Sequence, residues 1–306
     1  MPYSEPNTCL LCEKEQPLIP IKQHFLCNEC LNEGNDWRLA KWESWFQKQI
    51  SHYLHLCKRC LKTDDTEAIH QARVTGRKLA SLLQFLNVPK KHPLMKAIKH
   101  IHALLNPVRE ADVFLDAFRE RNQAVHQQLF KKVHKKRKKQ QKKLRESMPK
   151  WIKEASQQFS AFSSEELPFY ALSIDPDARI HVFEERFSEK AEHYQQTSDS
   201  YGKQAAQSVK ALHKVRIQAK MLRYMYANLA SLMGRDFSKK EQYYKSIQSQ
   251  FGEINDVQDW LDKLERYEEK LNAPKEEIAS VRAKWHRRLN VLIEEVTVKP
   301  VKTRAG

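Results

Sequence analysis

The cysteines of this chain are spaced as metal ligands. All six lie in Cys-x-x-Cys pairs, and fourteen residues separate the first two pairs. Each short turn can aim two thiolates at one ion, and the segment between the pairs is long enough for a small hairpin that completes a tetrahedral site. We therefore expect a structural Zn²⁺ ion in a zinc-ribbon-like module, bound by Cys9, Cys12, Cys27 and Cys30.

A redox-active dithiol is the competing interpretation of these pairs. Such a centre usually needs one pair beside a βαβ pattern, which this sequence does not show. Disulfides are disfavoured because the first residues have neither the basic n-region nor the apolar h-region of a secretion signal. The third pair, Cys57 and Cys60, lies in a segment of helical periodicity near His52 and His55. We interpret this pair as small buried side chains of a helix.

A second set of candidate binding residues is cationic and follows helical spacing. His70, Arg73 and Arg77 form one stripe at positions i, i+3 and i+7. The second stripe consists of His213, Arg216, Lys220 and Arg223. Apolar residues adjoin both stripes, so each helix can bury one face and present its cations to a groove. A solvated face with acidic partners is the alternative, but no Asp or Glu lies between Tyr201 and Leu232.

The two stripes belong to an internal repeat. Residues 69–79 align with 212–222 at a shift of 143, and residues 105–116 align with 251–262 at a shift of 146. A repeat of this length indicates two similar helical units. Further cations lie outside the stripes and are expected to face the same space: Lys96 and Lys99 in the first unit, and Lys245, Arg282 and His286 in the second.

Residues 131–145 are the most basic segment of the chain. Ten of these fifteen residues are Lys or Arg and none is acidic, yet helical sequence flanks them, so we expect one long helix rather than a basic tail. The like-charge neighbours on such a helix cost about 1.5–3.5 kcal/mol together, which a bound anion would offset. The cations of its main stripe are Lys131, Lys135, Lys138 and Lys142.

The composition restricts the elements that can position these residues. Only 6 of 306 residues are Gly, against a usual share of about 7%, so sandwiches, barrels and Gly-rich phosphate loops are disfavoured. Apolar residues recur every three or four positions, which predicts an all-α fold of two pseudo-symmetric helical bundles. No apolar run approaches the ~20 residues of a membrane span. We expect a cytoplasmic protein that makes no membrane contact.

The net charge and the turn residues divide the chain. Residues 1–36 carry a net charge of −4, so the remainder must carry +20 to reach the +16 of the whole chain. We expect helix breaks at 63–65, 88–89, 106–107 and within 162–177. The predicted organisation is a cysteine module at 1–35, a first helical half at 36–162, a linker at 163–177, a second half at 178–297 and a tail at 298–306.

Motifs for catalysis are missing from the sequence. It contains no G-x-x-x-x-G-K-[ST], no G-x-S-x-G and no H-E-x-x-H. Four carboxylates could hold Mg²⁺ in principle: Glu110, Asp112, Asp256 and Asp259. We interpret them as helix caps or as partners of nearby arginines, and we expect that the protein is not an enzyme.

The repeated segments resemble the two halves of a CHAD domain, the conserved-histidine α-helical domain. The resemblance lies in the motifs around His70-x-x-Arg73 and His213-x-x-Arg216, and Arg109-Glu110-x-Asp112-Val113 looks like the Arg-Asp-x-Asp-Val motif of that family. It covers about residues 36–297. The chain departs from the family pattern in three places: Ala80 and Met221 replace cations, and Asn255-Asp256 replaces Arg-Asp.

The resemblance implies a fold of two helical bundles and binding of inorganic polyphosphate in a basic central channel, without catalysis. By position it implicates both cation stripes together with Lys78. An RNA- or DNA-binding protein that uses the basic helix and the zinc module is the runner-up, followed by an accessory domain of polyphosphate-metabolising enzymes or an enzyme acting on polyphosphate. Polyphosphate granules, or a protein partner of the zinc module, are the further partners that we consider.

Overall fold

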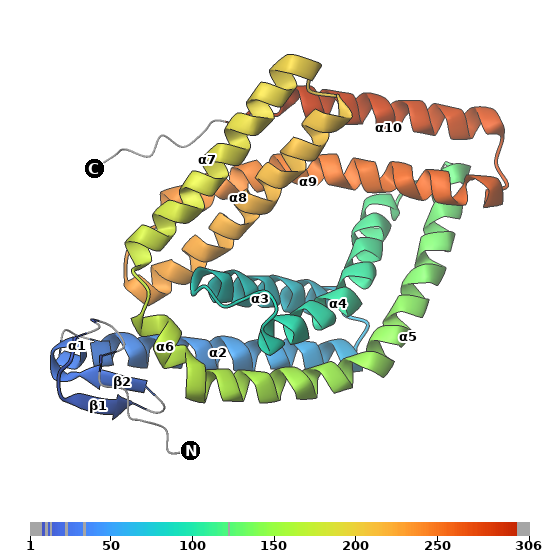
Figure 1. The fold of residues 1–306 in the computed structure, drawn as a ribbon. Helices are drawn as coiled ribbons and strands as arrows, with labels where there is room; N and C mark the ends of the chain where they lie inside the picture. Colours follow the sequence, from blue (N-terminus) through green and yellow to red (C-terminus); the bar gives the residue numbers. More distant parts are fainter. Residues whose placement is uncertain are drawn as a thin grey trace. The chain divides into compact units, whose positions relative to one another are not determined.

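The structure is a computed structural model that describes residues 8–9, 12, 14–21, 24–32, 35–121 and 123–298. The described part is helical apart from one hairpin, which confirms the all-α prediction (Figure 1). The hairpin strands are β1 (Leu18–Ile21) and β2 (His24–Cys27), and the short helix α1 (Asn28–Asn32) follows. The predicted tail, 298–306, falls outside the described residues except for Val298. No helix among the described residues has the length and apolar character needed to cross a bilayer.

The order of the long helices repeats along the chain. The first series is α2 (Asn35–Lys62), α3 (Thr66–Phe85), α4 (Pro93–Phe118) and α5 (Ala124–Ala161). The second is α7 (Pro176–Tyr201), α8 (Ala206–Met233), α9 (Ser238–Tyr267) and α10 (Lys275–Glu295). Between the series lie the π-helix η1 (Phe162–Glu166) and α6 (Leu167–Leu172), and the 3₁₀ helix η2 (Glu268–Lys270) follows α9. The two cation stripes lie on α3 and α8, the corresponding helices of the two series.

The contacts between Cα atoms divide the described chain into two units. Unit 1 contains the described residues up to Leu105, together with Leu144–Arg179 and Ser231–Gly234. Unit 2 contains Asn106–Lys143, Ile180–Ala230 and the described residues from Arg235 onward. Helices α4, α5, α7 and α8 therefore contribute residues to both units. These units are defined by contacts, so the domain boundaries expected from the sequence repeat stay a prediction.

Unit 1 is built on the helical hairpin of α2 and α3, which pack side by side (Figure 1). The predicted break at 63–65 is confirmed, and Asp65 explains it. Its Oδ1 accepts a hydrogen bond from the backbone N–H of Glu67 at 2.9 Å, which caps the start of α3, and Arg59 Nη2 lies 2.7 Å from its Oδ2. The turn that joins the two helices is therefore fixed at both ends by one carboxylate.

The end of α3 is fixed by an arginine from the start of α7. Arg179 Nε donates to the carbonyl of Phe85 at 3.0 Å, and its Nη2 donates to the carbonyl of Gln84 and to Asn87 Oδ1, both at 3.1 Å. These bonds satisfy carbonyls that the helix end leaves without an intrahelical partner. Asn87 adopts a positive φ of 67°, the left-handed conformation in which helices commonly end.

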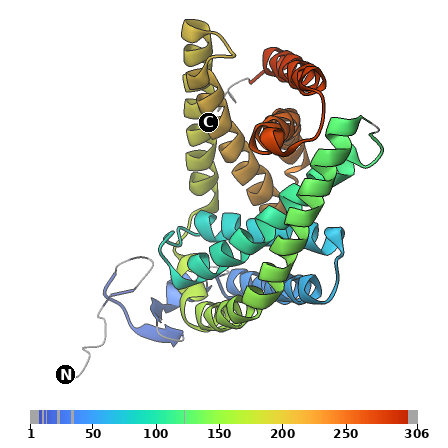
Figure 2. The same ribbon diagram turned by 90° about the vertical axis from the view of Figure 1, so that its right-hand side faces the viewer.

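Unit 2 contains two pairs of adjacent helices. Helices α9 and α10 run side by side in both views (Figures 1 and 2). Helices α7 and α8 are joined by Tyr226, whose hydroxyl donates to Glu184, and Lys240 Nζ at the start of α9 lies 2.8 Å from the same carboxylate. The ring of Tyr226 stacks on Tyr244 of α9 at 5.9 Å between centroids. Polar contacts within the core thus connect three helices of this unit.

An aromatic cluster fills the core where α4, α5, α9 and α10 meet within unit 2. Phe118, Trp260 and Trp285 contact one another at centroid distances of 4.9–5.9 Å. His126 lies against Trp285 at 5.8 Å and is 3% exposed, and neither of its ring nitrogens has a hydrogen-bond partner among the described residues. Burial, together with the charges of Arg121 and Lys284, lowers the pKa of His126 to about 4.

One predicted helix break is wrong, because Asn106 and Pro107 lie inside α4. Proline removes one backbone hydrogen bond and normally ends or bends a helix. Here Leu105 and Val108 on either side are fully buried, so packing holds the helical conformation through the proline. The segment 163–177 also contains helix: Phe162 and Leu167 are fully buried in η1 and α6, and the chain leaves the helical conformation only near Ser173–Asp175.

Two glycines in helices differ in the space around them, which gives a matched pair of substitutions. A Cβ on Gly76 would lie 2.5 Å from His102 Nε2 and 2.7 Å from Tyr53 Cε2, whereas a Cβ on Gly252 would meet nothing within 4 Å. Alanine favours a helix over glycine by about 1 kcal/mol. Urea unfolding should show that Gly252→Ala stabilises by about 0.5–1 kcal/mol, while Gly76→Ala destabilises by about 1–2 kcal/mol because the core is overpacked. A Gly76→Ala protein as stable as the parent would contradict this packing.

The buried His126 predicts a loss of stability in acid. The pKa of His126 is lower in the folded chain than in the unfolded chain. Its contribution to the free energy of unfolding is therefore complete above about pH 6.5 and falls as the pH drops toward 4. The loss between pH 7 and 4 should reach about 3 kcal/mol. In His126→Gln, the loss of unfolding free energy between pH 7 and 4 should shrink by this amount. His134→Gln, which replaces an exposed histidine of the same helix, should show the same loss as the parent protein. Equal pH dependence in all three proteins would refute the role of His126.

Candidate functional site

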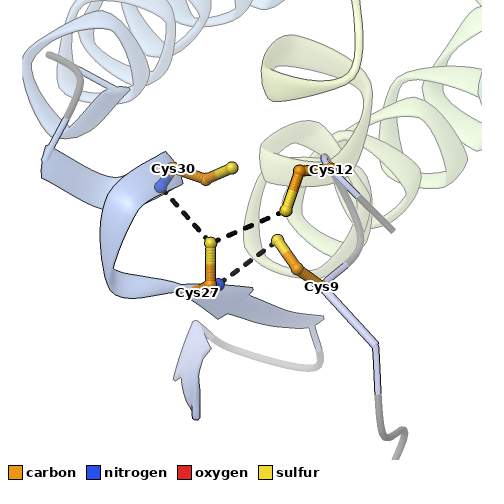
Figure 3. Close-up of side chains that lie close together, drawn as sticks. All are labelled: Cys9, Cys12, Cys27 and Cys30. Atoms are coloured by element: carbon orange, nitrogen blue, oxygen red, sulfur yellow. Dashed lines mark hydrogen bonds between the residues drawn. The ribbon is translucent and has the colours of Figure 1, made fainter. Parts of the chain in front are cut away.

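The four N-terminal cysteines converge on one point (Figure 3). Their sulfurs all lie within 4.8 Å of one another, and Cys12 Sγ is 3.8 Å from Cys27 Sγ. The hairpin expected between the two pairs is present: β1 and β2 pair antiparallel with Leu18 opposite Cys27. This register places Cys27 at the end of β2, and α1 begins at the next residue and carries Cys30.

Backbone groups orient the sulfurs. The N–H of Cys27 donates to Cys9 Sγ at 3.3 Å, and the N–H of Cys30 donates to Cys27 Sγ at 3.5 Å. The backbone N–H of Cys9 donates to the carbonyl of Lys14 at 3.0 Å. Donors of this kind stabilise thiolates, which are the form of cysteine that binds metal.

The spacing of the sulfurs fits a tetrahedral ion and excludes a disulfide between Cys12 and Cys27. A metal–sulfur bond of ~2.3 Å in a tetrahedral site places sulfurs about 3.8 Å apart, whereas a disulfide needs about 2.05 Å. All six cysteines are free thiols in this structure. The cluster is therefore compatible with a metal site. Cys57 and Cys60 lie apart from it in α2, both fully buried, and burial raises the pKa of Cys60 to about 12, as expected for small core side chains.

In unit 1 the predicted cations lie on two helices. The residues of the α3 stripe and Lys78 are half-buried, and Lys96 and Lys99 of α4 are exposed. Gly76, in the middle of the α3 motif, allows Tyr53 and His102 to approach the helix backbone closely. The stripe thus has a firmly packed helix beneath it, with Ala72 and Leu79 fully buried on the neighbouring face.

In unit 2 two arginines of the α8 stripe are held by side-chain amides of α9. Arg216 Nη1 donates to Asn255 Oδ1 at 3.2 Å, and Arg223 Nη1 donates to Gln248 Oε1 at 2.9 Å. Arg216 and Arg223 are half-buried, as is Lys220 between them, while His213 is exposed. An amide oxygen orients a guanidinium group without neutralising its charge. The departure from the family pattern at Asn255 therefore places a neutral anchor for Arg216 where the family often has a cation.

The basic run lies within α5, which confirms the expectation of one long helix. The members of its main stripe are all exposed: Lys131, Lys135, Lys138 and Lys142. Arg137 differs from them because it is buried, and its Nε lies 2.8 Å from Asp112 Oδ1 of α4. The interpretation of Asp112 as the partner of an arginine is confirmed.

Other carboxylates also face cations within unit 2. Asp259 pairs with Lys263 one turn further along α9. Burial and the neighbouring charge of Asp259 raise the pKa of Asp256, and the charges of Arg216 and Arg109 oppose that shift. Glu253 of α9 lies 2.9 Å from Arg288 of α10. Among the described residues, the cysteine cluster is the only group of three or more His, Cys, Asp or Glu side chains placed to share a metal ion.

The remaining predicted cations of unit 2 lie on α9 and α10. Arg282 of α10 pairs with Glu268 of η2, and both side chains are partly exposed. Lys245 of α9 and His286 of α10 are exposed. The spacing of the basic run also predicts a second stripe: Lys132, Lys136, Lys139 and Lys143. The pKa of Lys136 is lowered by partial burial and by the charges of Arg266 and Lys263 of α9. The spacing alone could not show which helix this stripe faces.

Comparisons with known proteins agree with this arrangement of helices. A family model of the CHAD domain matches residues 44–265. The crystal structure of the CHAD domain from the plant Ricinus communis is similar, with a TM-score of 0.58 and 17% sequence identity, over 85% of this chain and 92% of that chain. At this identity the likeness shows the fold alone. No curated protein matches the sequence.

Proposed function

Because this chain belongs to the CHAD domain family, we propose that it binds inorganic polyphosphate through the cations of its helices and does so without catalysis. The observation that carries the proposal is the anchoring of Arg216 and Arg223 by Asn255 and Gln248. These amides orient the two guanidinium groups without adding a negative charge. An oriented guanidinium group is suited to phosphate oxygens, with which it forms charge-assisted bonds.

The charge pattern favours a long anion over a single phosphate. Arg216, Lys220 and Arg223 follow one face of α8, and seven residues of helix span about 10 Å. The exposed lysines of α5, from Lys131 to Lys142, extend over a longer distance of about 16 Å. Polyphosphate carries about one charge per phosphate unit, so one chain can contact several of these cations and release several counterions on binding.

The carboxylates support a binding role rather than a catalytic one. Phosphoryl transfer usually needs metal ions held by acidic residues. Here Asp112 is engaged by Arg137 and Asp259 by Lys263, so both contribute to the packing of unit 2. We propose that the protein binds polyphosphate in the cytoplasm and accompanies it where it accumulates in granules.

Polyphosphate titrations can test this function. Arg216→Ala, Arg223→Ala and Arg73→Ala should each weaken binding of medium-chain polyphosphate about tenfold at low salt, because each removes a charge-assisted contact. Each should also reduce the slope of log K against log salt by about 1. Lys190→Ala, which removes an exposed lysine beside Glu189 of α7, is the control and should change neither value.

Two results would contradict the proposal. One is a lack of binding to medium-chain polyphosphate at low salt. The other is displacement of polyphosphate by RNA or DNA at a lower phosphate concentration, which would favour the nucleic-acid alternative. Release of phosphate in the presence of Mg²⁺ would show catalysis and overturn the non-catalytic part alone.

We also propose that the four-cysteine cluster holds one structural Zn²⁺ ion and that the module serves to recruit a protein partner. Bound Zn²⁺ would hold the β1–β2 hairpin, the turn after Cys9 and α1 together, since these elements supply the four sulfurs. The module is acidic, unlike the helical body, so its surface is better suited to a protein than to a polyanion.

Metal analysis tests the zinc assignment. The purified chain should contain one zinc per molecule, and Cys27→Ser should lose it, because three thiolates and a hydroxyl bind zinc much more weakly. Cys60→Ser, which alters a buried cysteine of α2 outside the cluster, is the control and should keep the zinc. Zinc retained in Cys27→Ser, or absent from the unmodified chain, would rule out the assignment.

A further inference from the structure

Unit 2 contains a cavity that the proposed polyphosphate site does not use. It has a volume of about 310 Å³ and lies between α9, α10 and the end of the α4–α5 connection. This volume is at the small end of the range typical for small-molecule sites. Its walls include the two indole rings of the aromatic cluster, Trp260 and Trp285, so much of the lining is apolar and flat.

The polar residues around the cavity are mainly cationic. Arg121, Lys284 and Arg288 line it, and Glu253 and Asp256 are the opposing carboxylates. Glu253 is engaged by Arg288 at 2.9 Å, and burial raises the pKa of Asp256. Arg121 and Lys284 are exposed, and the guanidinium group of Arg121 lies over the ring of Phe118 at 5.2 Å. The cavity therefore combines aromatic walls with cations at its margin.

One donor of Trp260 has no partner among the described residues. The indole Nε1–H of Trp260 is buried and has no acceptor among the described residues. A buried donor without a partner is uncommon in folded proteins and calls for an explanation such as a bound group. Because this nitrogen has almost no accessible surface, a ligand in the cavity would contact the ring face of Trp260 rather than this donor.

From these features we infer that the cavity between α9 and α10 binds a nucleoside phosphate, with the base against Trp260 and Trp285 and the phosphates toward Arg121, Lys284 and Arg288. Aromatic side chains stack with any nucleobase, and arginine and lysine are the usual partners of phosphate. Inorganic polyphosphate lacks the ring that the indoles would contact. The lining residues of this site differ from the members of the cation stripes, so the inference does not depend on the proposed function.

Titration of the full chain with ATP and with tripolyphosphate separates a base-binding site from a purely electrostatic one. The two ligands share the triphosphate, but only ATP has a ring. Trp260→Leu should lower the affinity for ATP about tenfold and leave the affinity for tripolyphosphate unchanged. Lys284→Ala, an exposed position that should not disturb folding, should weaken ATP severalfold. Glu253→Gln removes a carboxylate from the cavity and should raise the affinity for ATP severalfold. Trp151→Leu in unit 1 is the control and should have no effect on ATP.

Several outcomes would overturn this inference. The first is that ATP fails to bind at millimolar concentration. The second is that ATP and tripolyphosphate bind equally in every variant, which would show that the base makes no contact. The third is that long-chain polyphosphate displaces ATP from the unmodified chain but not from Arg216→Ala, which would place ATP on the basic stripe of α8. Polyphosphate binding measured in Trp260→Leu keeps the two proposals distinguishable, because it should match that of the parent.

Discussion

Repulsion between like charges is the constraint on which the rest of this structure depends. The helical body carries a net charge of +20. It must therefore fold despite the repulsion between the cations on its surface. Apolar faces supply the stability: α3 buries Ala72 and Leu79 beside its cations, and α8 buries Val215 and Leu222. Cations and carboxylates pair inside unit 2 where packing requires it, as in Arg137 with Asp112, while the lysines of the main stripe of α5 are exposed.

Much of the fold follows from local signals in the sequence. The Cys-x-x-Cys spacing predicted the hairpin between the pairs, Asp65 marked the start of α3, and the flanks of the basic run predicted the length of α5. The helix break predicted at Asn106 and Pro107 was wrong, because the buried residues on both sides hold the helix together. Such an override depends on contacts between distant segments, which spacing along the chain does not contain.

The candidate sites divide in the same way. Residue types and helical spacing identify the cations of α3 and α8 and the four cysteines, since each motif is contained in one short segment. The amide anchors of Arg216 and Arg223, the cations that face Lys136 and the cavity beside Trp260 each need two or three helices to be placed against one another. A single sequence identifies the members of such groups only after the fold is known.

The amide anchors also determine how the basic stripe of α8 responds to its surroundings. Asparagine and glutamine side chains do not titrate, so Asn255 and Gln248 hold Arg216 and Arg223 in the same way in mildly acidic and in alkaline solution. A carboxylate in either position would release its arginine on protonation. The orientation of these two guanidinium groups is thus independent of protonation in the range where carboxylates titrate.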